Sequence, residues 1–335
     1  RERVPSLRGR DLRSMTAAGV NGTAAGSPAA AEPLLQADRI ASKATGVDPQ
    51  TPRLPCWTWV FRFAFLLILL LCTLPIWVIV LLTDVCGCVP GSAEGRRRRG
   101  RFIGRAIAVA WRLAMRLSFW IRIDRAGAEP LHDAGKSGRK VFVAINHASF
   151  MDTPLACILT PIRLIGDSKT LMASMHYKMP ILGRVAKAVG HLPVPFRSNA
   201  RGENAVDKEK MAQSLAMLDE HLNHDGHLLI FPEGDLNRQW RTLRQFRVGG
   251  LETCIRHDME VWGLVLAGPA ECWPECEPLG GAPARISCKA AMLYSSGKDA
   301  GVELAGPDAD LRTQALALAA DMKRRMQAML DEIGR

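Results

Sequence analysis

The sequence lacks the features that hold small secreted domains together. It has no Cys-x-x-Cys pair, its nine cysteines are an odd number, and no signal-peptide pattern stands at its N-terminus. A disulfide framework is therefore not expected, and the thiols are predicted to be reduced. The first residue is Arg1, and Met15 is a candidate initiator.

A recognisable metal motif is also missing. The nearest candidate is a set of four side chains: Cys254, His257, Cys272 and Cys276. Their spacing matches no common zinc module, so we expect no metal and ordinary buried thiols. Four other cysteines lie in or near an apolar run: Cys56, Cys72, Cys86 and Cys88. Palmitate is an alternative there, although plain thiols are favoured.

Positive charge, by contrast, is abundant, with a formal net charge of +11. Much of it lies in six arginines that follow the apolar run: Arg96, Arg97, Arg98, Arg99, Arg101 and Arg105. Positive charge attracts nucleic acid, acidic lipid and phosphate ligands alike. Because these arginines come directly after an apolar run, a lipid surface is favoured and no nucleic-acid partner is expected.

The N-terminal part divides into a polar tail and an apolar helix. Residues 1–55 are rich in Ala, Gly, Ser, Pro and Arg without an apolar period, which predicts a disordered tail. The stretch from Phe63 to Leu82 is uncharged and would span about 30 Å as a helix. We predict a transmembrane helix over residues 56–83, with a buried core helix as the alternative. The basic residues after it place the downstream domain in the cytosol by the positive-inside rule.

Residues 84–125 are predicted as a basic linker followed by an amphipathic helix at the membrane surface. Arg101, Arg105, Arg112 and Arg116 fall in one arc of a helix, with aromatic and aliphatic residues between them. This pattern is typical of a helix in the headgroup layer whose guanidinium groups bind lipid phosphates. A second spanning helix, or an ordinary amphipathic helix packed on the soluble domain, are the alternatives.

Residues 126–335 have the pattern of a globular α/β domain. Short apolar runs predict four buried strands: Val141 to Ile145, His227 to Phe231, Val261 to Leu266 and Ile286 to Leu293. Apolar residues recur at helical spacing from Met211 to Leu222 and from Leu311 to Ile333. Strands that alternate with helices predict a sheet with helical cover.

Two polar segments directly follow predicted strands. After Ile145 comes Asn-His-Ala-Ser-Phe-Met-Asp, in which His147 and Asp152 are a candidate general base and its partner. Pro154 suits a first helical turn, so Asp152 would stand at a helix N-terminus. An ionised carboxylate beside an imidazole fixes its tautomer. A structural capping cluster is the alternative.

The second segment is Phe231-Pro232-Glu233-Gly234, with four arginines further along the chain: Arg238, Arg241, Arg244 and Arg247. A turn that carries a glutamate beside arginines is typical of a site for phosphate and hydroxyl groups, or of a solvated loop with scattered ion pairs. Together the two segments resemble the glycerolipid acyltransferases, over roughly residues 120–300. That resemblance implies an α/β sheet with helices on both faces, His147 as the general base with Asp152 as its partner, and Glu233 and Gly234 in acceptor binding.

Two further positions follow from the resemblance. The stretch from Gly190 to Arg197 is similar to the family block that contacts the acceptor phosphate, which implies that role for Arg197. The family usually continues Phe-Pro-Glu-Gly with Thr-Arg-Ser, but Asp235 to Arg238 stands here, and Arg238 is expected to supply the cation.

The resemblance implies direct transfer of a fatty acyl group from acyl-CoA, a co-substrate, to lysophosphatidic acid, giving phosphatidic acid. No bound cofactor is expected. Ser149 as a nucleophile activated by His147 is an alternative. Glycerol 3-phosphate or another lysophospholipid as acceptor, and a non-catalytic membrane scaffold, are the competing functions. The expected place is the cytosolic side of the endoplasmic reticulum or another internal membrane.

Overall fold

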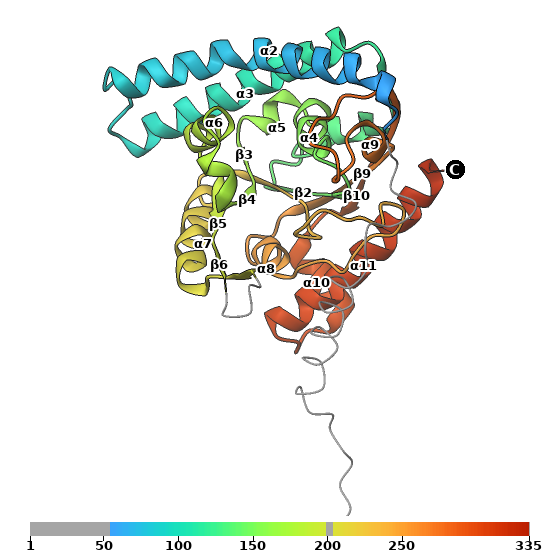
Figure 1. The fold of residues 1–335 in the computed structure, drawn as a ribbon. Coiled ribbons are helices and arrows are strands. Elements are labelled where there is room, and N and C mark those ends of the chain that lie inside the picture. Colours follow the sequence, from blue (N-terminus) through green and yellow to red (C-terminus); the bar gives the residue numbers. More distant parts are fainter. Residues whose placement is uncertain (1–53, 199–203, 335) are drawn as a thin grey trace, which may run out of the picture. The chain divides into compact units, whose positions relative to one another are not determined.

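The structure is a computed structural model that describes residues 54–198 and 204–334. The predicted disordered tail, apart from its last two residues, and Met15 lie outside the described residues. Within the described residues the chain forms a mixed α/β fold around one large sheet (Figure 1).

The large sheet has six strands in the order β1-β10-β9-β2-β8-β3. Its strands are β1 (Ile121–Asp124), β2 (Val141–Ile145), β3 (Ser168–Lys169), β8 (His227–Ile230), β9 (Glu260–Ala267) and β10 (Ala284–Tyr294). All neighbouring pairs are parallel except the antiparallel β9 and β10. Two small sheets pair β4 (Leu171–Ala173) with β5 (Leu192–Val194) and β6 (Phe196–Ser198) with β7 (Asn204–Val206).

Helices cover both faces of the sheet, as the sequence predicts. The described helices up to Val189 are η2 (Cys56–Thr58), α2 (Trp59–Val85), α3 (Ala93–Leu117), η3 (Ala126–Asp133), α4 (Asp152–Leu159), α5 (Ile162–Ile165), η4 (Ser174–Lys178) and α6 (Leu182–Val189). The later ones are α7 (Lys208–Leu222), α8 (Gly249–Arg256), α9 (Pro269–Cys272), α10 (Gly297–Ala305) and α11 (Leu311–Ile333).

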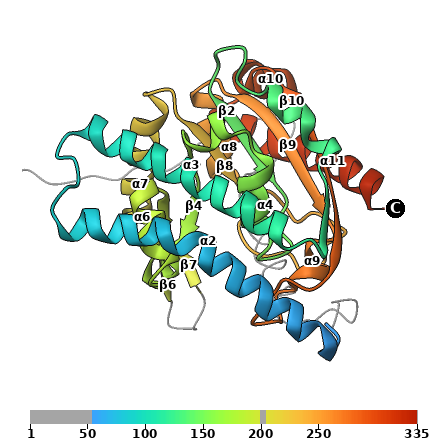
Figure 2. The same cartoon turned by 90° about the horizontal axis from the view of Figure 1, so that it is seen from above.

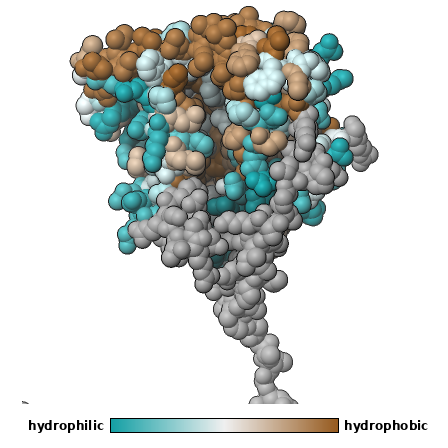
Figure 3. Space-filling model, in the orientation of Figure 1, coloured by the Kyte–Doolittle hydropathy of each residue, from teal (hydrophilic) through white to brown (hydrophobic). Residues whose placement is uncertain are grey.

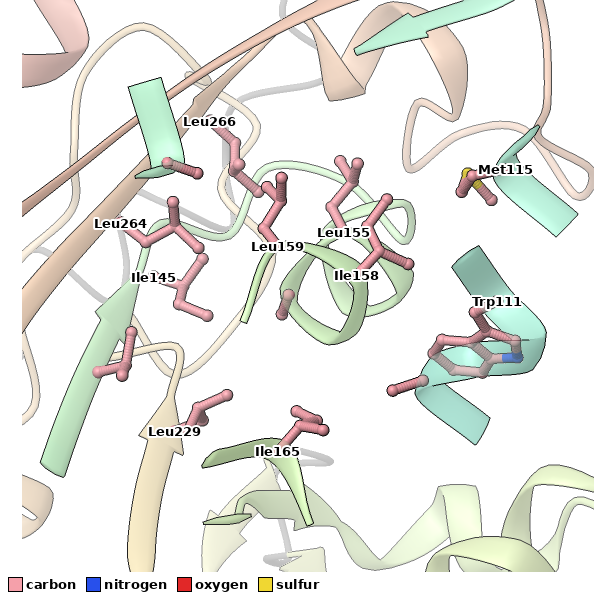
Figure 4. Close-up of a cluster of buried hydrophobic side chains, with 14 of the residues drawn as sticks. Trp111, Met115, Ile145, Leu155, Ile158, Leu159, Ile165, Leu229, Leu264 and Leu266 are labelled. Carbon is pink, nitrogen blue, oxygen red and sulfur yellow. The ribbon is translucent and has the colours of Figure 1, made fainter. Parts of the chain in front are cut away.

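Side chains along β2 alternate between the two faces of the sheet and belong to two different core clusters. Val143 and Ile145 point into a cluster with α3 and α4, where Trp111 and Leu155 are buried (Figure 4). Phe142 belongs to the opposite cluster, which α7, α8, α10 and α11 complete. Successive strand side chains face opposite ways, so a run that is apolar throughout is needed when both faces are covered. This explains why the neighbouring strands β2, β8 and β9 are predicted from apolar runs.

The predicted apolar helix is present as α2, and by length and composition it could cross a membrane. It lies beside α3 across one side of the domain (Figures 1 and 2). Contacts bind it to the domain near both ends: Arg62 is buried against Glu277, and Asp84 pairs with Arg99 and Arg184. Its other face is exposed and apolar (Figure 3).

Three of the four α3 arginines expected at lipid phosphates have partners within the domain. Arg101 and Arg105 form ion pairs with Asp167, and Arg112 donates to the carbonyl groups of Ile158 and Thr160. The reason is that this arc of α3 faces α4 and α5, whose ends present a carboxylate and unpaired carbonyl groups.

The exposed arc of α3 carries the apolar side chains of Phe102, Val109, Leu113 and Leu117, with Arg105 and Arg116 also exposed. The sheet also begins before the predicted boundary at residue 126. Strand β1 lies in the segment expected to be a linker, and it pairs with β10 as an edge strand of the large sheet.

Candidate active site

The two polar segments meet because their strands are neighbours. Strands β2 and β8 pair in parallel, so their carboxyl ends lie at the same edge of the sheet. His147 follows β2 and Glu233 follows β8, and ligand sites in α/β sheets are usually found at this edge. Asn146 fixes the chain just before His147, since its side chain exchanges two hydrogen bonds with the main chain of Leu266 in β9.

The predicted pair of His147 and Asp152 is present. The Nδ1 atom of His147 lies 3.1 Å from Oδ2 of Asp152, and helix α4 begins at Asp152 as expected. The imidazole stacks on the ring of Phe231, with 4.1 Å between ring centroids. With Nδ1–H directed to the carboxylate, Nε2 is the nitrogen left to accept a proton, and 18% of the His147 side chain is exposed.

Asp152 holds the loop that follows β2 as well as the imidazole. Its Oδ2 atom also accepts hydrogen bonds from the amides of Ala148 and Ser149, at 2.7 and 2.8 Å, and the side chain is fully buried. Burial raises the pKa of the Asp152 carboxyl above its usual value, while His147 and the two amides act in the opposite direction. Its Oδ1 atom has no hydrogen-bond partner among the described residues.

Glu233 occupies the expected place, but its contacts are with the protein itself. One carboxylate oxygen accepts the amide of His147 at 3.0 Å, and the other accepts the amide of Arg244 and the side chain of Asn237. Only 3% of the residue is exposed, and burial raises the pKa of its carboxyl. Direct binding of the acceptor by Glu233 is therefore not what this geometry supports. Glu233 instead ties the loop after β8 to the main chain of His147.

Two residues of the site are ones that the sequence interpretation missed. Asn237 donates its main-chain N–H to the carbonyl of His147 at 2.7 Å, and its side-chain amide bonds Glu233 and the carbonyl of Thr242. Phe231 is the surface on which the imidazole rests. The signals were available, because Asn237 stands where the chain departs from the family pattern and Phe231 opens the Phe-Pro-Glu-Gly segment.

Ser149 is poorly placed to act as a nucleophile. Its hydroxyl donates to the carbonyl of Trp273 at 2.6 Å and accepts the amide of Met151 at 3.0 Å. The residue is fully buried. Both hydrogen-bonding roles of the hydroxyl are thus used in fixing the loop that follows His147, which disfavours the alternative of an acyl-serine intermediate.

The remaining candidates differ in how far the structure describes them. Gly234 has φ of +72°, and a Cβ atom there would lie 2.1 Å from Nε of Arg247, so the turn requires glycine. Arg238 is paired with Glu275 at 2.8 Å, which offsets the charge expected to meet the acceptor. Arg197 lies in β6, and its side chain is outside the described part of the chain.

The cysteine and histidine set considered for zinc is not brought together. Cys254 lies in the core cluster on one face of the sheet and Cys272 in the cluster on the other. Within residues 54–198 and 204–334, no group of three His, Cys, Asp or Glu side chains is arranged to hold a metal ion.

Comparison with known proteins agrees with the motifs. A family model described as acyltransferase matches residues 122–266, from β1 to β9. The fold is similar to the crystal structure of the 1-acyl-sn-glycerophosphate (LPA) acyltransferase PlsC from Thermotoga maritima, with a TM-score of 0.51 and 15% sequence identity. That similarity covers 81% of this chain and 96% of the other. A search of curated proteins finds no match. Residues 122–266, which carry both motifs at one sheet edge, therefore form a domain that matches the acyltransferase family.

Proposed function

We propose that the chain transfers a fatty acyl group from acyl-CoA to the free hydroxyl of lysophosphatidic acid, giving phosphatidic acid. The observation that carries this is the contact of His147 with Asp152, beside the Glu233 turn, at the carboxyl ends of β2 and β8. The pair has the geometry of a general base with an orienting carboxylate.

The proposed reaction is a direct transfer. Nε2 of His147 takes the proton of the acceptor hydroxyl as its oxygen attacks the thioester carbonyl. The tetrahedral oxyanion collapses, the C–S bond breaks, and the thiolate leaves as a thiol with the proton held by His147. Asp152 stabilises the imidazolium that exists between these steps, and a positioned base of this kind contributes about 10²- to 10⁴-fold in rate.

The substrates are proposed to reach the site from a bilayer. The exposed faces of α2 and α3 are apolar, with Phe63, Leu67 and Leu71 on α2 and Phe102 and Leu113 on α3 (Figure 3). Contiguous apolar surface of this kind marks contact with a membrane or another protein.

Because its opposite face is bound to the domain near both ends, we propose that α2 lies in one leaflet with its axis along the membrane. The choice of a cytosolic surface of an internal membrane remains a prediction from the sequence alone.

The acceptor is the less constrained part of the proposal. The pairing of Arg238 with Glu275 offsets one of the two cations, Arg197 and Arg238, that the sequence assigns to the acceptor. Glycerol 3-phosphate and other lysophospholipids are therefore tested beside lysophosphatidic acid.

The test is an acyl transfer assay on membranes that contain the chain, with labelled oleoyl-CoA and each acceptor in turn. His147→Ala is compared with His224→Ala, a surface histidine after α7 that serves as the matched control. We expect product only with the wild type and His224→Ala. Equal turnover by His147→Ala would refute the catalytic assignment, and the scaffold function would then be preferred.

A further inference from the structure

A second feature of the molecule is a cationic cavity at the end of α2. It has a volume of about 370 Å³ and lies between the end of α2, the first half of α3, η4 and α6. Four cationic side chains and one carboxylate line it: Arg99, Lys178, Arg184, Lys187 and Asp84. None of the residues of the proposed catalytic site lines this cavity.

The charge of the cavity is only partly balanced. Asp84 pairs with both Arg99 and Arg184, at 2.7 and 3.0 Å, so one negative charge is shared by two guanidinium groups. Lys178 and Lys187 have no carboxylate partner among the described residues, and both are exposed. A concave site with such an excess of positive charge attracts anions, and phosphate groups above all.

Tyr177 also lines the cavity. Its hydroxyl is buried away from solvent, so the charged side chains are the groups that meet an anion there.

The position of the cavity indicates where the anion comes from. Asp84 is near the last residue of α2, directly beside Leu82 and Val85, which are 55% and 75% exposed. The apolar surface of α2 therefore runs up to the mouth of the cationic cavity. An amphipathic ligand with a phosphate head and acyl chains matches both surfaces at once, whereas a soluble phosphate uses only one.

We propose that this cavity binds the phosphate headgroup of an anionic membrane lipid. The site goes beyond the proposed acyl transfer and does not depend on it. Bound headgroups there would hold the end of α2 and the start of α3 at the lipid surface.

The test uses the purified full chain and flotation with phosphatidylcholine vesicles, with and without phosphatidate. We expect the double variant Lys178→Gln/Lys187→Gln to bind phosphatidate vesicles roughly 25-fold more weakly, from about fivefold for each lysine. The charge-matched control Lys136→Gln/Lys298→Gln, on exposed lysines away from the cavity, should bind like the wild type. Binding to vesicles of phosphatidylcholine alone should be the same for all.

The control pair separates a built site from diffuse attraction, because both double variants remove the same charge. Wild-type affinity in the Lys178→Gln/Lys187→Gln variant, or an equal loss in the control variant, would overturn the proposal. Inorganic phosphate and CoA are added as soluble competitors. If a low concentration of either one displaced the chain completely from phosphatidate vesicles, the assignment to a lipid would be overturned.

Discussion

Replacing Asp152 by Asn tests the catalytic pair without dismantling its loop. A single oxygen, Oδ2, accepts all three hydrogen bonds, from His147 and from the amides of Ala148 and Ser149. The amide oxygen of Asn can take that place, and its NH₂ group then replaces Oδ1, which has no partner among the described residues. We therefore expect the free energy of unfolding to stay within about 1 kcal/mol of the wild type.

The rate should respond much more strongly than the stability. Unit charges 3.1 Å apart attract by about 1 kcal/mol in bulk water and by about 5 kcal/mol at an effective dielectric constant near 20. His147 is charged only after it has taken the hydroxyl proton, so this attraction acts between the proton transfer and the release of the thiol. About 1.4 kcal/mol is a tenfold change in rate. Because the aspartate is fully buried, we expect kcat to fall roughly 10²- to 10⁴-fold in Asp152→Asn.

The assay combines acyl transfer from labelled oleoyl-CoA with urea unfolding, and Asp152→Ala serves as the comparison. The alanine variant leaves two amides and an imidazole without their acceptor, so it should lose about 2 kcal/mol or more of stability. A wild-type rate in a folded Asp152→Asn protein would refute the role of the carboxylate charge. An unfolded Asp152→Asn protein would refute the single-oxygen argument.

The same variant has a pH dependence of predictable sign. Burial raises the pKa of the Asp152 carboxyl in the folded state above the value of about 4 in the unfolded state. Below the unfolded-state pKa the protonated carboxyl stabilises the fold, and this stabilisation is lost as the pH rises through the folded-state pKa. Asp152→Asn has no such loss. The difference in unfolding free energy between variant and wild type should therefore shift in favour of the variant from acidic to neutral pH. A difference that shifts the opposite way would show that hydrogen bonding, and not burial, dominates.

Three other substitutions give separate tests. Gly234→Ala should lower the free energy of unfolding by about 2 kcal/mol or more, because it combines a positive φ with a clash against Arg247. Gly138→Ala has the positive φ alone and should lower it by about 1 kcal/mol, as measured by urea unfolding. Ser149→Ala should lower stability by about 1–3 kcal/mol yet keep acyl transfer within about tenfold of the wild type, and complete loss of turnover in a folded variant would restore the nucleophile. Leu71→Glu, on the exposed face of α2, should leave the melting temperature unchanged but weaken vesicle binding about tenfold or more.

The parts of the fold that the sequence predicts are those set by burial. The runs from Val141 to Ile145 and from Val261 to Leu266 are buried on both faces, so they are apolar throughout. The short strands β3 to β7 have two or three residues each, too few for any period to show. Strand β1 has four residues with polar ones alternating, and it is defined only by pairing with β10, far along the chain.

For the site, the sequence predicts where the residues lie but not what they contact. The motifs place His147, Asp152 and Glu233 correctly, because residues that follow neighbouring parallel strands must meet at one edge. The carboxylate of Glu233 contacts the main-chain amides of Arg244 and His147. The pattern of side chains along the sequence does not predict the direction in which a main-chain amide points. The arginines of α3 are a similar case, since their period predicts one face of the helix but not what packs against it.

The apolar surface and the catalytic loop are parts of one packed unit. Phe65 of α2 is buried against Trp273, with 6.3 Å between ring centroids, and the carbonyl of Trp273 holds the hydroxyl of Ser149. Arg62 of the same helix bonds Glu277 and the carbonyl of Leu279 in the loop that follows Trp273. The depth at which α2 sits in a leaflet would therefore fix the height of His147 above the lipid. A soluble acceptor can reach His147 at any height above the lipid, whereas a hydroxyl held at the headgroup layer requires His147 at that height. A fixed height of His147 therefore favours a lysolipid over glycerol 3-phosphate as the acceptor.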